Sequence, residues 1–254
     1  MSFSDSDLTT FAEINNLIFS ATLHDLSTFL DRSIEHASPE ELRIINRTLS
    51  EPSTLNLLIN RIINKPYFFE KVTNKSYCHE NGFHKIVLLA GTHFKLRLHH
   101  FGVGAKIPME NIHDHRWPFA STILLGNLYM DYFEVSNEYE GSEEVFHFIY
   151  TAAKRNNRYS TELIGKTLMK KSRSVAHKTG DCYLMRTEDL HRITNEPGAE
   201  SITLILTGKP QSDQCNLYAK REILEEEKQI LKYNADELKS MLSIIREKIY
   251  PQKN

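Results

Sequence analysis

Two histidines, His113 and His115, are the residues whose type and spacing point most directly to chemistry. They stand one residue apart in segment 112–117, which reads IHDHRW. In a β-strand, side chains i and i+2 project from the same face, so both imidazoles would point toward one position. Two nitrogen ligands that converge in this way suit a transition metal. The pattern therefore predicts part of a metal site, which needs a third ligand and elements to hold it.

The composition indicates a soluble, cytoplasmic globular protein. The chain has 254 residues, a formal net charge of -2, 13 phenylalanines and 11 tyrosines. This charge gives no bulk attraction to nucleic acid or to an anionic membrane. The polar, acidic N-terminus lacks the pattern of a signal peptide, and no apolar run approaches the roughly 20 residues that span a bilayer. Three cysteines without metal or disulfide spacing favour a reducing compartment, and they are Cys78, Cys182 and Cys215.

Helical patterns occupy both ends of the chain. Residues 1–75 carry apolar residues at spacings of three and four and form a predicted helical N-terminal extension. Within it, Ser38 followed by Pro39 and by a glutamate three residues after the serine is a helix start. A further helix is expected over 54–64. Residues 211–254 form a predicted helical tail, with helices over 218–232 and from Asn234 or Asp236 to about Lys248.

The middle of the chain, residues 76–210, changes to short β-rich runs. Gly126-Asn127 separates two of these runs and predicts a hairpin turn. Strands at such regular spacing are typical of a sandwich or barrel. The expected strands cover 86–89, 94–101, 121–125, 128–135, 145–151, 162–170, 182–186 and 201–207. The fold class is therefore mainly β with helical flanks.

A resemblance to the cupin superfamily emerges from two motifs in this region. The His-x-His pair followed by Gly126 resembles the first cupin motif, and Gly180, His191 and Asn195 have the spacing of the second. The resemblance implies a double-stranded β-helix, or jelly-roll, barrel. It also implies that His191 is the third metal ligand beside His113 and His115.

The site resembles that of the cysteine dioxygenase (thiol dioxygenase) branch, although with departures, and the His-Asp-His-x-Trp segment also resembles that of uncharacterised bacterial cupins. Phe119 stands where the first motif usually has a glutamate ligand, and Ala120 replaces the thioether-forming cysteine. Arg186 and Glu188 replace the usual Pro and Gly of the second motif. The resemblance implies Fe(II) held by three neutral imidazoles, with positions open for substrate and O₂; Zn, Ni, Mn or Co are alternative ions. The departures argue against cysteine itself as the substrate.

Several further residues are candidates for the site, and each also has an ordinary structural interpretation. Lys85 and Arg97 are positional candidates for holding a substrate carboxylate. Arg116 and Arg192 either meet a substrate anion or form surface ion pairs, and Trp117 is a wall or core residue. The hydroxyls of Tyr129, Tyr132 and Tyr183 serve as acid, base or O₂-site groups, or simply fill the core. Three lesser candidates remain. Glu110 is an alternative carboxylate ligand, His99 and His100 are adjacent histidines that could belong to the site, and Cys182 offers a thiol that could line it.

These interpretations lead to three functional hypotheses. The first is an Fe(II)-dependent oxygenase that acts with O₂ on a small anionic or thiol-bearing molecule. The second uses the same site as a Lewis acid for isomerase or lyase chemistry without O₂. The third is a non-catalytic ligand or metal sensor whose helical ends contact partners. All three imply a small-molecule ligand, no nucleic acid and no membrane, and a homodimer is a possible assembly.

Overall fold

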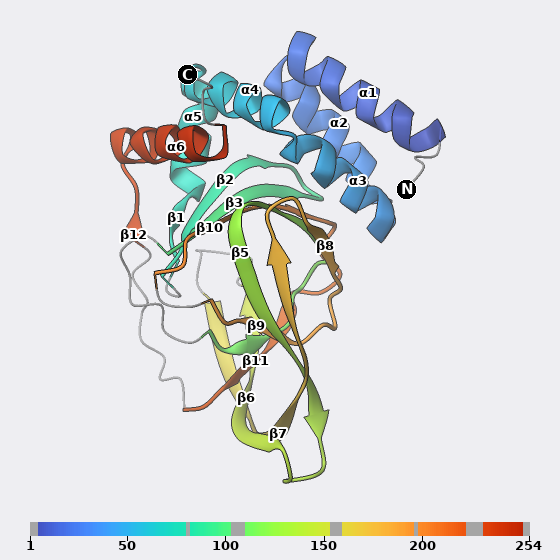
Figure 1. Ribbon diagram of the computed structural model, residues 1–254, viewed down its shortest axis with the longest axis vertical. Helices are drawn as coiled ribbons and strands as arrows, with labels where there is room; N and C mark the ends of the chain where they lie inside the picture. The colour runs from blue at the N-terminus through green and yellow to red at the C-terminus, as the bar shows by residue number, and fades with distance from the viewer. Residues whose placement is uncertain are drawn as a thin grey trace.

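The computed structural model describes residues 5–79, 82–102, 110–152, 159–195, 198–221 and 231–250. The fold is mainly β with helical flanks, as the sequence predicts. Helices cover one face of a strand assembly, and the longest strands extend away from them (Figure 1). Among the described residues, no helix combines the length and apolar character required to cross a membrane.

Five helices form the N-terminal extension, and proline begins three of them. They are α1 (Asp5–Ser20), α2 (Leu23–Glu35), α3 (Pro39–Ser50), α4 (Pro52–Ile63) and α5 (Pro66–Lys75). Proline suits the first helical position because its missing N–H would have no intrahelical partner there. The predicted start of α3 is confirmed: Ser38 and Glu41 form a reciprocal capping box. The predicted helix over 54–64 corresponds to α4.

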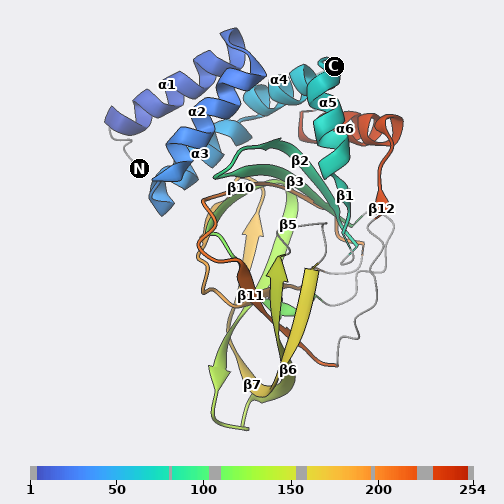
Figure 2. The ribbon, with the colours of Figure 1, turned by 180° about the vertical axis from the view of Figure 1, so that it is seen from behind.

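The strands form two antiparallel sheets that share β5. The described strands are β1 (Tyr77–Cys78), β2 (His84–Ala90), β3 (Lys95–Phe101), β4 (Ile112–His113), β5 (Phe119–Ser136), β6 (Ser142–Ala152), β7 (Tyr159–Lys178), β8 (Cys182–Met185), β9 (His191–Ile193), β10 (Ser201–Thr207), β11 (Gln214–Ala219) and β12 (Leu231–Lys232). The first sheet runs β12-β1-β2-β3-β10-β5-β8. In the second, the pairings β5-β7-β6-β11-β4-β9-β5 close into a ring. Both sheets are visible from behind in Figure 2.

The predicted hairpin at Gly126-Asn127 is wrong, because β5 continues through both residues as a strand of 18 residues. Up to Gly126, β5 pairs with β10 in the first sheet. From Asn127 onward it pairs with β7 in the second sheet. Gly126 has φ 75° and so occupies a conformation that glycine tolerates best. The glycine thus allows one strand to pass from one sheet to the other.

We expect Gly126→Ala to lower the free energy of unfolding by at least about 2 kcal/mol. A Cβ at Gly126 would lie 2.1 Å from the carbonyl oxygen of Glu200, which is backbone and has little freedom to move. Gly141→Ala is the matched control, since Gly141 has φ 74° and its nearest neighbour would be 3.8 Å away. Urea denaturation of both variants measures the difference. Equal stabilities of the two variants would contradict this account of the crossing.

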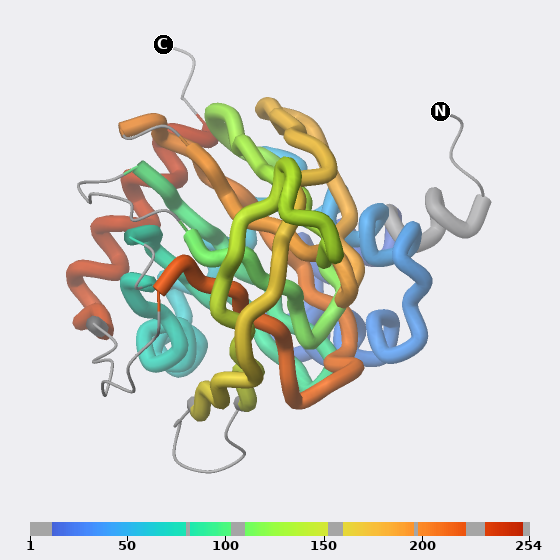
Figure 3. The backbone as a smooth tube through the Cα atoms, turned by 90° about the horizontal axis from the view of Figure 1, so that it is seen from below, coloured from blue at the N-terminus to red at the C-terminus, as the bar shows by residue number. Residues whose placement is uncertain are grey.

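The helices bury the outer face of the first sheet. Alternate residues of β3, Leu96 and Leu98, join the apolar residues of the helices in one core. Asn46 on α3 is fully buried there and binds the sheet twice. Its side-chain N–H donates to the carbonyl of Leu204 at 3.1 Å, and its oxygen accepts from the Thr122 hydroxyl at 2.5 Å. Seen from below in Figure 3, helices α2 and α3 (blue) and helix α6 (red) lie at opposite ends of the same helical layer.

The inner face of the first sheet is different, because β3 turns its polar residues inward. Arg97 is only 5% exposed, and Phe101 belongs to a second core that includes Phe119 and Tyr132. The strict alternation of β3 left open whether its polar face meets solvent or the interior. The structure shows that the apolar face of β3 contacts the helices and that its polar face points toward the second sheet.

The C-terminal region is only partly the predicted helical tail. Helix α6 (Ala235–Ile249) begins at Asn234, which forms a capping box with Glu237 as expected. The predicted helix over 218–232 is wrong at both ends, where residues 218–219 belong to β11 and residues 231–232 form β12. Its middle, 222–230, lies outside the described residues. Strand β11 pairs with β4 and β6, so this part of the tail is a component of the second sheet.

Candidate metal centre

Three histidine side chains converge between the sheets. His113, His115 and His191 each offer one ring nitrogen, and these three atoms all lie within 4.8 Å of one another. The ring centroid of His191 is 4.6 Å from that of His113 and 5.0 Å from that of His115. His191 is 2% exposed. The three residues that the two sequence motifs single out therefore form one cluster.

Short strands bring these histidines together from distant parts of the chain. His113 ends β4 and is the direct antiparallel partner of His191, which begins β9. His191 also pairs with Tyr132 of β5 in the second sheet. His115 lies beyond the end of β4, where its backbone N–H donates to the carbonyl of Thr187 at 3.4 Å. The cluster thus depends on cross-strand pairing as much as on the i, i+2 spacing.

Backbone carbonyls determine which ring nitrogen is available in two of the histidines. The Nδ1 atom of His113 lies 2.9 Å from the carbonyl oxygen of Asn111, and Nδ1 of His191 lies 3.1 Å from that of Asp189. A carbonyl can only accept, so both Nδ1 atoms carry the proton and both Nε2 atoms keep a lone pair. Outer hydrogen bonds of this kind orient metal-binding histidines. The Nε2 atom of His115 is buried and has no hydrogen-bond partner among the described residues.

Burial keeps the imidazoles of His115 and His191 neutral. It lowers the pKa of His191 to about 3, with a smaller contribution from the neighbouring His113. It also lowers the pKa of His115 well below the usual value, and His113, His191, Arg97 and Lys85 act in the same direction. Neutral imidazole is the form that binds a metal, since the lone pair must be free. The donor set therefore fits a divalent transition ion, for which nitrogen ligands of this kind suit Zn, Cu, Fe or Ni.

Phe119 stands where the first cupin motif usually has its glutamate ligand, and its ring packs beside the histidine cluster. The ring of Phe119 meets that of His115 edge to face, with centroids 4.9 Å apart. Phe119 is 4% exposed and belongs to the inner core. The fallback carboxylate Glu110 accepts a hydrogen bond from the backbone N–H of Ile193 at 2.9 Å and is not part of the histidine cluster. The described ligand set consists of three histidines.

A group of basic side chains surrounds Trp117 beside this cluster. The guanidinium carbons of Arg116 and Arg97 lie 4.6 and 5.0 Å from the Trp117 ring centroid, and the amine of Lys95 lies 5.6 Å from it. The ring of Trp117 stacks toward His115 at 6.5 Å. Such short distances from cations to a ring favour cation–π attraction. Trp117 therefore connects the basic group with the histidines.

Lys85 extends this basic group. Its amine donates a hydrogen bond to the hydroxyl of Tyr77 at 2.9 Å. Burial lowers the pKa of Lys85 well below its usual value, and the positive charges of Arg97, Lys95 and Arg116 lower it further. Among the described residues, Lys85, Lys95 and Arg116 form no ion pair with a carboxylate. The guanidinium groups of Arg97 and Arg116 make the region beside the histidines positive and suited to an anion.

The three tyrosine candidates have different positions. Tyr129 is 40% exposed and lies on the opposite face of β5 from Tyr132, so the expectation that it lines the site is not met. Tyr132 is buried, and its ring centroid is 6.4 Å from that of His191. Tyr183 faces the inner core, where its ring stacks on His177 at 4.2 Å. Burial raises the pKa of both Tyr132 and Tyr183, so both hydroxyls keep their protons.

Arg192 makes structural contacts and does not occupy the substrate-facing position that the sequence suggested for it. It follows His191 in β9 and so projects from the opposite face. Its guanidinium forms an ion pair with Glu143 at 3.2 Å and lies 4.7 Å from the ring centroid of Phe133. Those contacts hold β9 against β6 and β5. The structure accordingly separates Arg192 from the basic group around Trp117.

The remaining candidates divide between the two faces of the first sheet. His99 faces inward, and its buried Nε2 has no hydrogen-bond partner among the described residues. His100 faces outward and contacts Glu200 at 2.6 Å, so the adjacent pair is split as expected. Cys182 is not a lining thiol, since its sulfur lies 3.7 Å from the Asn46 side chain beneath α3. Asp114, between the two histidines in the chain, has a structural role: its carboxylate accepts from the backbone and side-chain N–H groups of Asn216 at 2.6 and 2.5 Å.

Lys95 is a site-adjacent residue that motif analysis did not single out. The signal was present in the alternation of β3, where Lys95, Arg97 and His99 share one face. The second motif contributes structural residues as well. Gly180 has φ 92°, which glycine tolerates well. Asn195 accepts from the Tyr129 N–H at 2.9 Å and donates to Ser201 at 3.1 Å, and so connects β5 to β10.

Comparison with known proteins finds no matching family model and no matching curated protein. Similar solved structures include a cupin-like protein from Thermotoga maritima, with 10% identity over 52% of this chain and 70% of that chain and a TM-score of 0.29. A double-stranded β-helix protein from Klebsiella pneumoniae is 12% identical over 60% and 95% of the two chains, with a TM-score of 0.32. Hydroquinone 1,2-dioxygenase from Sphingomonas sp. TTNP3 is 9% identical over 56% and 72%, with a TM-score of 0.33. At such scores these likenesses carry no argument, and the function must be argued from the site.

Proposed function

We propose that this protein is a metal-dependent oxygenase, with Fe(II) as its ion, that acts with O₂ on a small anionic molecule. The observation that carries the proposal is the convergence of three histidine side chains, two of them kept neutral by burial, beside the guanidinium groups of Arg97 and Arg116. His113, His115 and His191 would hold the ion. Fe(II) held in this way supplies the ability to activate O₂ while leaving positions for substrate.

The charge balance of the site supports an anionic substrate. Three neutral ligands leave the full positive charge of a divalent ion uncompensated, unlike a set of two histidines and a carboxylate. Arg97 and Arg116 add positive charge on the adjacent wall. Burial strengthens such interactions, because the local dielectric constant is lower than that of water. A substrate with a carboxylate, thiolate or enolate group would neutralise both the ion and this wall.

The residues of the wall have distinct roles in this proposal. Arg116 and Arg97 present planar guanidinium groups, which can hold a carboxylate through two parallel hydrogen bonds. Their positions over the Trp117 ring restrict their orientations. Tyr132, whose hydroxyl remains protonated, offers a proton donor on the strand that pairs with His191. Phe119 and Trp117 exclude water from the side of His115.

The test combines metal analysis with O₂ consumption. Purified protein is expected to contain about one equivalent of iron, and O₂ uptake should begin on addition of a substrate from a panel of small thiols, 2-hydroxy acids and dihydroxyaromatic compounds. Turnover with Zn, Ni or Mn and without O₂ uptake would support the Lewis-acid hypothesis instead. Tight ligand binding without turnover would support a sensor.

We expect Arg116→Gln to raise the KM for an anionic substrate at least about tenfold, because one charge-assisted hydrogen bond contributes 1.5–3 kcal/mol or so. Iron content should remain that of the wild type, since Arg116 is not a ligand. Arg186→Gln is the control: Arg186 is exposed and already interacts with Glu188 and Asp189. An unchanged KM in Arg116→Gln would remove this residue from the substrate site.

A further inference from the structure

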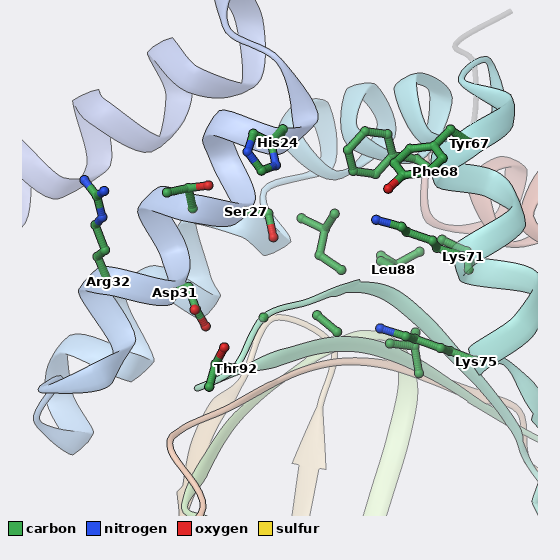
Figure 4. A pocket seen from close by; sticks show the side chains of 16 residues that line it. His24, Ser27, Asp31, Arg32, Tyr67, Phe68, Lys71, Lys75, Leu88 and Thr92 are labelled. Atoms are coloured by element: carbon green, nitrogen blue, oxygen red, sulfur yellow. The ribbon is translucent and has the colours of Figure 1, made fainter.

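A second candidate binding site lies on the outer face of the first sheet, away from the histidines. It is a groove between helices α2 and α5, with strand β2 as its floor (Figure 4). Its volume is about 600 Å³, which falls within the range typical of small-molecule sites. Its floor includes Leu88 and Leu89, which belong to the core beneath the helices. The groove therefore faces the helical layer, whereas the metal centre lies between the sheets.

One face of α5 supplies the positive wall of the groove. Tyr67, Lys71 and Lys75 are spaced four residues apart and so lie in one row along the helix. Figure 4 shows the amines of both lysines extending from α5 into the groove. Both lysines are exposed, and neither forms an ion pair among the described residues. The amine of Lys71 lies 4.1 Å from the ring centroid of Tyr67, whose side chain is 64% exposed.

The opposite wall, on α2, contributes polar groups, one carboxylate and, at its far end, the guanidinium of Arg32. His24, Ser27 and Thr28 line the groove facing α5. The carboxylate belongs to Asp31, which accepts a hydrogen bond from the backbone N–H of His93 at 2.7 Å. Figure 4 places Asp31 near Thr92, away from the two amines. The end of the groove toward α5 consequently combines two unpaired ammonium groups with aromatic surface and hydroxyl donors.

We propose that this groove binds a small molecule in which a flat ring carries a phosphate or carboxylate group. Lys71 and Lys75 would hold the oxyanion from one side, and Ser27 would donate from the other. Tyr67 and Phe68 offer the apolar surface for the ring. Two ammonium groups without counterions make an anion a better occupant than a neutral or cationic molecule. The proposal is independent of the oxygenase function, because it uses none of the residues of the metal centre.

Calorimetric titration with three matched probes tests the site. The probes are phenyl phosphate, benzoate and benzyl alcohol, which share a ring and differ in the charge of the group that it carries. Saturable binding of one or both anions is expected, at least about tenfold tighter than that of the alcohol. The tighter of the two anions identifies the phosphate or the carboxylate as the natural group. Equal affinity for the alcohol, or no saturable binding at millimolar concentrations, would overturn the proposal.

Variants locate the bound anion. Lys71→Gln/Lys75→Gln should raise the Kd at least about tenfold, and both positions are exposed, so folding should be unaffected. Lys170→Gln is the matched control, a surface lysine on β7 that is 3.8 Å from Glu138. His191→Ala should bind the anion as the wild type does. Loss of binding in His191→Ala, or unchanged binding in the double variant, would assign the anion to the metal centre and exclude the groove.

Discussion

Replacing His191 by alanine is expected to weaken metal binding by at least about 100-fold. Loss of a residue that only orients a ligand typically costs 10–100-fold in affinity, and loss of a direct ligand should cost more. His191 is the candidate ligand with the most constrained environment, since it is 2% exposed and paired with both β4 and β5. Competition with a chromogenic chelator, together with elemental analysis of the purified protein, measures the change.

A matched variant separates ligation from general damage to the second sheet. His147 lies in β6, where its ring stacks on Tyr218 and its Nε2 is 2.9 Å from the Asn216 side-chain oxygen. It is not part of the cluster, so His147→Ala should keep the wild-type metal content and affinity. Circular dichroism should show that both variants are folded. Wild-type metal affinity in folded His191→Ala would show that the three histidines are not the ligands.

The second prediction with a large expected effect is that the stability of the folded protein falls as the pH decreases. The pKa of His191 is about 3 in the folded protein and that of His115 is well below its usual value, whereas both return to about 6.5 on unfolding. Below pH 6.5 the unfolded chain therefore binds protons that the folded protein does not. Stability should fall with decreasing pH, by up to about 1.4 kcal/mol per pH unit for each histidine. His191 alone should cost about 1.6 kcal/mol between pH 6.5 and pH 5, and His115 acts in the same direction.

Urea denaturation of chelator-treated protein at several pH values measures this dependence. Other buried histidines, including His99 and His84, contribute in the same direction, because burial lowers their pKa values as well. The comparison that isolates the cluster is His191→Gln, which cannot titrate and should lose the share of the slope due to His191. Identical pH dependence of the wild type and His191→Gln would contradict the assigned pKa shift.

Much of the fold could be predicted, because its signals are local. The start of α3 at Ser38 and that of α6 at Asn234 follow from capping residues close in the chain. The error at Gly126 has a physical reason: a positive φ serves a hairpin turn and a strand crossing equally well. Strands β4 and β9 have only two and three residues, which is too short for any periodicity. Strands β4 and β9 form because they pair with strands that are distant in the sequence.

The cluster of three histidines could be predicted from the sequence, whereas most of the residues around it could not. Alternation in β3 placed Lys95, Arg97 and His99 on one face, yet only the packing of the helices against Leu96 and Leu98 decides that this face points inward. The choice between Tyr129 and Tyr132 depends on the register of β5 against β9. The groove likewise required the relative positions of α2, α5 and β2, which no local pattern encodes.

The direct pairing of His113 with His191 gives a bound ion a mechanical role as well as a chemical one. The two residues are about 80 positions apart in the chain, and they lie in the two shortest strands of the second sheet's ring. An ion shared between them is a cross-link that closes this loop. Because such an ion binds only the folded chain, it stabilises that state by mass action, by about 2.7 kcal/mol when the free ion is at roughly 100 times its Kd. Metal supply would then regulate the lifetime of the folded chain as well as its activity.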